Sequence, residues 1–216
     1  MKVHEYKGED ITVVYDVHRC IHARECVHGQ PSVFNPDAKP WVNPRAAEAS
    51  AIAAVVQRCP TGALHYQAAN LDLAELADPS NTFTTSPDGP LYLRGNITVV
   101  TEGGQELLSD TRMALCRCGA SKNKPLCDNS HHAAAFEDPG MASPGEDAAK
   151  EMATSGKLRV IPTLNGPLHL QGQITIRNAA NRVIFEGVET WLCRCGASGH
   201  KPFCDGSHER VGFKSE

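Results

Sequence analysis

The distribution of apolar and polar positions over the N-terminal third of the chain predicts two strands and one helix. Residues Ile11–Asp16 and Gly62–Tyr66 combine β-branched and aromatic side chains, which is typical of strands. Between them, residues Arg45–Arg58 carry Ala, Glu, Ile and Val in a pattern that favours a helix. The N-terminal part is therefore expected to be a small α+β module whose cysteines lie in loops.

Two later segments, Leu91–Val100 and Leu168–Arg177, are rich in Leu, Ile, Thr and Val and are predicted as strands. Residues 78–89 and 138–147 are rich in Pro, Ser, Gly and Asp, a composition that indicates connectors. We therefore expect a boundary near residues 75–85 and three domains, at residues 1–75, 84–137 and 157–216.

The second and third domains repeat each other. Of the 17 positions in residues 115–131, 13 are identical to those in residues 192–208. When the sequence is aligned with itself so that Leu115 falls on Leu192, the cysteines and one histidine of the two copies superimpose without a gap: Cys116, Cys118, Cys127 and His131 fall on Cys193, Cys195, Cys204 and His208. Such a duplication predicts that both copies share one fold.

Composition and charge argue against nucleic-acid binding and against insertion into a membrane. With 21 basic against 25 acidic residues, both signs interspersed, the chain lacks the basic face that nucleic acids require. No apolar stretch approaches the roughly 18 residues of a membrane span, and the N-terminus has no targeting pattern, so we expect a cytoplasmic protein. Aromatic residues make up only 6% of the chain, so its cores are expected to be thin and to be helped by metal.

The nine cysteines fall into three groups of three, an arrangement that disulfide pairing would not produce. In a reducing compartment, clustered cysteines are more often metal ligands. The C-terminal copies each present the pattern C-x-C-x8-C-x3-H. Three thiolates and an imidazole would also suit a structural zinc ion, although zinc sites usually show C-x2-4-C spacing.

The segments 116–131 and 193–208 closely resemble the signature of the CDGSH iron-sulfur (NEET-type) family. The resemblance implies a 2Fe-2S cluster in each copy, with the first two cysteines on one iron and the third cysteine and the histidine on the other. It also implies that the two β-rich copies pack as an internal pseudo-dimer, in a chain expected to be a monomer. Asn129 replaces the glycine found at Gly206, and asparagine is the best substitute if the position requires a positive φ.

The N-terminal cysteines Cys20, Cys26 and Cys59, the last followed by Pro60, are similar to a bacterial ferredoxin run in which Ala23 replaces the second ligand. Three thiolates suit a 3Fe-4S cluster, which we therefore expect at this site. A 4Fe-4S cluster is the alternative and would need a further ligand such as His22 or His18. Residues 8–67 resemble the divergent single-cluster ferredoxin family, which implies a ferredoxin-like fold.

A cluster with one imidazole ligand carries less negative charge than an all-cysteine cluster, so it accepts an electron more readily. The imidazole can also be protonated, which would loosen its iron. We therefore expect one-electron transfer to redox partner proteins, coupled to proton transfer in some conditions. Storage of iron-sulfur clusters or their transfer to apo-proteins is the alternative function, and a structural zinc-binding module is the third possibility. No nucleophile and base pair, phosphate loop or nicotinamide motif is present, so no enzyme activity is expected.

Overall fold

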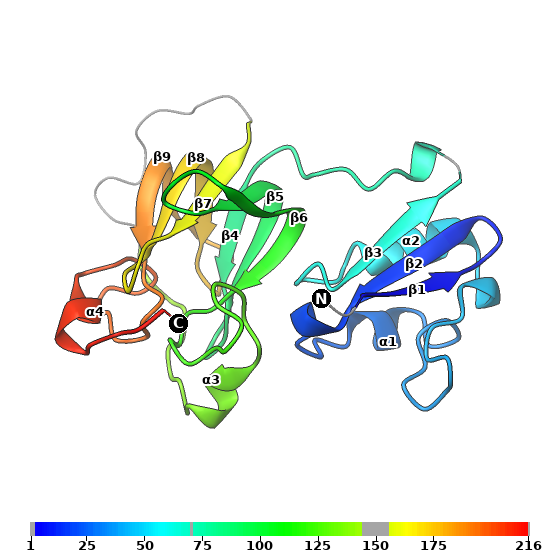
Figure 1. Ribbon diagram of the computed structural model, residues 1–216, viewed down its shortest axis with the longest axis horizontal. Helices are drawn as coiled ribbons and strands as arrows, with labels where there is room; N and C mark the ends of the chain where they lie inside the picture. The colour runs from blue at the N-terminus through cyan, green and yellow to red at the C-terminus, as the bar shows by residue number, and fades with distance from the viewer. Residues whose placement is uncertain (1–2, 70, 144–155, 216) are drawn as a thin grey trace. The chain divides into compact units, whose positions relative to one another are not determined.

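The computed structural model describes residues 3–69, 71–143 and 156–215, and the chain forms two compact units, Met1–Leu76 and Ala77–Glu216 (Figure 1). Strands dominate both units and the helices are few and short, so the fold class is α+β.

The first unit is a three-stranded antiparallel sheet in the order β1 (Val3–Lys7), β2 (Ile11–Asp16) and β3 (Leu64–Ala68). Helix α2 (Ala49–Val56) contributes Ile52 and Val56 to a core that also contains Val13 and Phe34. The remaining helical segments of this unit are η1 (Val17–Arg19), α1 (Glu25–Gly29), η2 (Pro44–Ala46) and η3 (Leu71–Leu73).

Strand β2 confirms the prediction, and β3 begins two residues later than expected. The helix is shorter than predicted because the chain is extended at Ala47 and Glu48, after a single 3-10 turn that Asn43 caps. Strand β1 was missed, since its side chains are half-buried or exposed and give no apolar signal.

The second unit contains six strands in one sheet: β4 (Thr82–Thr85), β5 (Leu91–Val100), β6 (Glu106–Leu115), β7 (Leu158–Pro162), β8 (Leu168–Arg177) and β9 (Val183–Leu192). The bounds of β5 and β8 are those predicted. Two short helices, α3 (Ser130–Ala133) and α4 (Ser207–Arg210), follow β6 and β9 respectively.

The first strand of each copy pairs with both copies. Strand β4 lies antiparallel to β5 of its own copy and parallel to β8 of the other, while β7 lies antiparallel to β8 and parallel to β5. The registers follow the sequence repeat, because Thr82 faces Thr175 and the equivalent pair, Arg159 and Thr98, also face each other. The duplication is therefore visible in the hydrogen bonding between the copies as well as within each.

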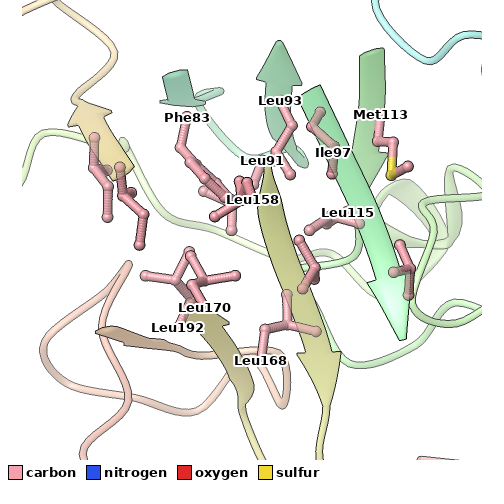
Figure 2. Packing of buried hydrophobic residues seen from close by; sticks show 14 of the residues in the cluster. Phe83, Leu91, Leu93, Ile97, Met113, Leu115, Leu158, Leu168, Leu170 and Leu192 are labelled. Atoms are coloured by element: carbon pink, nitrogen blue, oxygen red, sulfur yellow. The ribbon is translucent and has the colours of Figure 1, made fainter. Parts of the chain in front are cut away.

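One hydrophobic core serves both copies. Figure 2 shows buried side chains of the first copy meeting those of the second in a shared interior, and Leu91, Leu93, Leu158, Leu168 and Leu170 are all fully buried. Each copy thus depends on the other for burial of its apolar strand faces.

The two predicted connectors carry more structure than their composition suggested. Residues 78–89 include β4, whose Phe83 enters the shared core. In the second connector, Gly140 accepts hydrogen bonds from Thr85 Oγ1 at 2.8 Å and from the amide of Ala179 at 2.8 Å. Residues 144–147 lie outside the described residues. In its described part, residues 138–143, this connector is therefore bound by partners far along the chain.

Candidate metal centres

Two centres in the second unit hold the cysteine and histidine side chains that the sequence singled out. The first centre contains Cys116, Cys118, Cys127 and His131, and the second contains Cys193, Cys195, Cys204 and His208. In each, the first two cysteines directly follow a long strand, β6 or β9, and the histidine lies in α3 or α4.

The donor atoms of the first centre form two pairs. Cys116 Sγ and Cys118 Sγ are 3.7 Å apart, and Cys127 Sγ lies 3.5 Å from His131 Nδ1. Two sulfurs on one tetrahedral metal, with bonds of about 2.3 Å, lie about 3.8 Å apart, so each pair fits one metal ion.

The second centre has the same geometry. The Cys193 and Cys195 sulfurs are 3.6 Å apart, and Cys204 Sγ lies 3.5 Å from His208 Nδ1. Across the described residues of the chain, no three His, Cys, Asp or Glu side chains converge on the position of a single metal ion. The donors of both centres are therefore arranged two and two.

Backbone amides donate to the sulfurs at matching positions. Ala120 N lies 3.4 Å from Cys118 Sγ and Asn129 N lies 3.5 Å from Cys127 Sγ, and Ala197 and Gly206 repeat these contacts in the second centre. Asn129 has φ 71° and Gly206 has φ 82°. The position therefore has a positive φ in both copies, the condition under which asparagine is the best substitute for glycine.

The aspartate after the third cysteine orders the turn that carries the histidine. Asp128 accepts hydrogen bonds from Ser130 N at 3.0 Å and from Lys122 N at 2.8 Å. Burial opposes ionisation of Asp128, but the bonds from Ser130 and Lys122 outweigh it and lower its pKa. In the second centre, backbone donors from Gly199 and Ser207 lower the pKa of Asp205. Each aspartate directly precedes the left-handed N-cap residue of the helix, Asn129 or Gly206.

Burial shifts the pKa values of the ligand side chains toward their neutral forms, which suits the histidine but not the cysteines. Burial lowers the pKa of His131, which keeps its imidazole neutral and able to bind metal. Burial raises the pKa of Cys127 to about 11, and the hydrogen bond with Cys118 together with burial raises the pKa of Cys116. Thiolates at these positions therefore require nearby positive charge, which a bound metal supplies.

A buried arginine lies between the first two cysteines of each centre, and sequence reasoning missed it. Arg117 and Arg194 are 1% and 3% exposed. The Nε atoms donate to Gly89 O and Gly166 O, both at 2.8 Å. The guanidinium groups lie over Phe136 and Phe213, at 5.2 and 5.4 Å from the ring centroids.

Residues of the two centres also meet each other. A Cβ atom placed at Gly119 would lie 2.6 Å from Cys195 O, and one at Gly196 would lie 2.6 Å from Cys118 O. Lys124 Nζ is 5.8 Å from the ring centroid of Phe213 in the other copy. The ligand loops of the copies thus pack backbone against backbone.

The N-terminal candidate centre is a cavity of about 480 Å³ in the first unit, a size typical of cofactor sites. Its lining includes His22, Ala23, Tyr15 and Trp41 together with all three predicted cysteines, Cys20, Cys26 and Cys59. Burial raises the pKa of Cys26 to about 11. Burial and a hydrogen bond with Cys20 raise the pKa of Tyr15, so its phenol faces the cysteine as a neutral group.

Of the two histidines considered as an additional ligand, His22 lines this cavity. His22 has φ 55°, which is uncommon for a residue with a side chain, and such backbone strain gathers at functional sites. His18 lies in η1 and does not belong to the lining found among the described residues. Sequence reasoning did not connect Tyr15 and Trp41 with the cysteines, since no local motif links them.

These centres, with their cysteine-rich donor sets, define an iron-sulfur cluster-binding protein. Comparison with known proteins gives the particular family. A divergent 4Fe-4S mono-cluster model matches residues 6–69, and an iron-binding CDGSH-type zinc finger model matches residues 88–132 and 165–209. The chain therefore belongs to the tandem CDGSH proteins that carry an N-terminal divergent 4Fe-4S mono-cluster domain.

Relatives with similar sequence include the uncharacterized protein YjdI of Escherichia coli strain K12 and its counterpart in Escherichia coli O157:H7. Each is 37% identical to this chain over 62 residues, which is 29% of this chain and 82% of the relative.

Proposed function

We propose that this protein transfers single electrons through a 2Fe-2S cluster in each CDGSH centre and a third cluster in the N-terminal unit. The observation that carries the proposal is the pairing of donors, since two pairs per centre provide two ligands for each of two irons. A single zinc ion would instead need all four donors around one position.

When bound, a 2Fe-2S cluster supplies one-electron redox chemistry. Three thiolates and a neutral imidazole would give the oxidised centre a formal charge of about −1, which one electron makes about −2. The chain itself prepares the site for that charge. Four backbone amides donate to ligand sulfurs, and a buried arginine, Arg117 or Arg194, follows the first cysteine of each centre. These donors favour the reduced state.

At the N-terminal centre we propose a four-iron cluster held by Cys20, Cys26 and Cys59, with His22 at the corner that Ala23 leaves open. The shared cavity and the strained backbone of His22 support this assignment. The three-iron cluster expected from the sequence differs from it by one iron and by its EPR signal, since a 3Fe-4S cluster is paramagnetic when oxidised.

The two CDGSH copies are proposed to act as an internal pseudo-dimer within a monomeric chain. The reciprocal strand pairing and the approach of Gly119 to Cys195 support it. Within the part of the chain that is described, no helix is long and apolar enough to cross a membrane. We propose a cytoplasmic, non-enzymatic role with redox proteins as partners.

Cluster transfer to apo-proteins is the second candidate, and the unequal burial of the two centres favours it. Cys127 and His131 are 3% and 6% exposed, whereas Cys204 and His208 are only half-buried. Water and an acceptor protein can therefore reach the histidine-bound iron of the second centre more easily than that of the first.

The test begins with anaerobically purified full-length protein. Iron and sulfide analysis should give eight irons if the N-terminal cluster has four, and zinc in place of iron would contradict the proposal. Mixing the reduced protein with an oxidised ferredoxin, and separately with an apo-ferredoxin, then compares the two roles. Electron transfer faster than cluster transfer supports the primary function, and the reverse order supports cluster delivery.

A further inference from the structure

The buried arginines are held alike in both copies but are neutralised in only one. Arg117 donates through Nε to Gly89 O and through a terminal nitrogen to Ser86 O, and Arg194 makes the same two bonds with Gly166 O and Thr163 O. In the first copy, Arg117 also forms an ion pair with Asp138.

The ion pair of the first copy is short and well supported. Arg117 Nη1 lies 2.6 Å from Asp138 Oδ1, and the side chains are 0% and 14% exposed. Asp138 Oδ1 also accepts from Gly140 N at 2.7 Å, and Asp138 N donates to Asp88 Oδ1 at 2.6 Å. Asp138 thus neutralises the arginine of the first copy, and the exposed Asp88 holds the backbone of Asp138 in place.

The second copy keeps the loop but loses both carboxylates. The alignment of the two copies places Asn165 at the position of Asp88 and Ser215 at that of Asp138. Ser215 N donates to Asn165 Oδ1 at 3.0 Å, which repeats the bond between Asp138 and Asp88. Among the described residues, no carboxylate forms an ion pair with Arg194, and Glu102, whose field reaches it, is exposed. The two copies therefore share the hydrogen bonding of this loop but differ in its charge.

We propose that Asp138, supported by Asp88, makes the two CDGSH centres electrically unequal and lowers the reduction potential of the first relative to the second. Arg117 follows Cys116 in the chain and acts on His131, so a carboxylate on Arg117 cancels positive charge at the first centre. Arg194 follows Cys193 and keeps its charge, which favours an added electron at the second centre. Its field also reaches Cys116, and this reduces the difference without removing the largely buried negative charge that Asp138 places on Arg117.

This difference in reduction potential would set the direction of electron transfer between the two CDGSH centres. One electron leaves the reduced first centre and enters the oxidised second centre, with no bond made or broken and no proton required. Asp138 does not bind a cluster itself. It acts through Arg117, whose positive charge it neutralises, and is therefore a positioning residue. The inference rests on the clusters of the proposed function, but not on whether their role is electron or cluster transfer.

Reduction potentials of the two centres test this inference. In full-length protein, Cys204→Ser removes a ligand of the second centre and Cys127→Ser removes one of the first, so that each CDGSH centre is titrated without the other. Dithionite is the electron donor and EPR is the readout, with the signal of the N-terminal cluster, which both variants retain, as the common background. Asp138→Asn keeps an oxygen for Arg117 but removes the charge, so the first potential should rise. One unit charge at about 10 Å and an effective dielectric of about 20 corresponds to roughly a tenfold change in the reduction equilibrium, or about 59 mV.

The reciprocal variant is Ser215→Asp, which should lower the potential of the second centre, with Ser215→Asn as the uncharged control. This variant adds a charge, so it keeps the test open if Asp138→Asn fails to fold. Clusters that form but show unchanged potentials in both charge variants overturn the inference and leave the proposed function standing. A shift confined to the opposite centre also overturns it, whereas a protein that binds no iron-sulfur cluster refutes the proposed function instead.

Discussion

Replacement of Gly119 by alanine tests the packing of the two ligand loops against each other. Gly119 has φ +80°, and a Cβ there would lie 2.6 Å from Cys195 O and 2.9 Å from Cys195 C. Both are backbone atoms, so no flexible side chain can move away. The contact can be relieved only by moving the loop that holds Cys116 and Cys118 or the one that holds Cys193 and Cys195.

Two effects add to the cost of this substitution. An alanine in the left-handed region costs roughly 1–2 kcal/mol, and overpacking of a rigid contact costs roughly 1–3 kcal/mol. We therefore expect Gly119→Ala to destabilise the second unit by roughly 2–5 kcal/mol. Both centres should lose iron faster, because the displaced backbone belongs to one and presses on the other.

Gly104→Ala provides the matched control. Gly104 has φ +84° in the turn between β5 and β6, and a Cβ there would meet nothing within 4 Å. It carries the same backbone cost, roughly 1–2 kcal/mol, without the contact. Urea unfolding of the cluster-loaded protein, followed by circular dichroism and visible absorbance, compares the two variants at equal m-values.

We expect a larger midpoint shift for Gly119→Ala than for Gly104→Ala, by about 1 M urea for a difference of about 2 kcal/mol and an m-value of about 2 kcal/mol/M. Gly196→Ala should match Gly119→Ala, since its Cβ would lie 2.6 Å from Cys118 O. Equal midpoints for Gly119→Ala and Gly104→Ala would refute the close approach of the loops.

Three further predictions concern the ligands and their surroundings. Ala23→Cys should yield a four-iron cluster that no longer needs His22, so that His22→Ala lowers the iron content of the wild type but not of this variant; equal losses in both would contradict the open corner. His131→Cys adds a negative ligand and should lower the potential of the first centre by on the order of 100 mV, as redox titration can show, while the second centre changes little. Asp205→Asn should reduce stability at pH 7 because the native carboxylate has a lowered pKa; the difference should shrink progressively as pH falls below about 4, through the unfolded pKa of about 3.9 toward the lower folded value, and a difference as large at pH 2 as at pH 7 would exclude this origin.

The sequence was a sufficient guide wherever the signal was local. Strands β5 and β8 have the predicted bounds because their own Leu, Ile and Val side chains are buried in the core. The spacing of the third cysteine and the histidine placed Cys127 and His131 four residues apart, and the turn that leads into α3 brings Cys127 Sγ and His131 Nδ1 to 3.5 Å. Local geometry of this kind follows directly from spacing.

What could not be predicted depends on contacts between distant segments. Strand β4 has a polar, threonine-rich sequence and exists because β5 and β8 both bind it. The partner of Arg117 is Asp138, in a segment whose composition suggested a loose connector. Comparison of the two aligned copies offers the one available signal, since Ser215 replaces Asp138 while Arg194 is kept.

Fusion of the two copies into one chain explains how this difference can exist. In a symmetric dimer of identical chains, any carboxylate beside one arginine appears beside the other, so both centres carry equal charge. In this chain, the contacts between the copies come in equivalent pairs. Gly119 packs against Cys195 of the second copy and Gly196 packs against Cys118 of the first, so a larger residue at either glycine would disrupt the packing of both loops. Asp138 and Ser215 instead contact only their own copy's loops in the bonds that hold Arg117 and Asn165. The charge beside each arginine can therefore vary independently, while the sheet pairing and the ligand geometry remain symmetric.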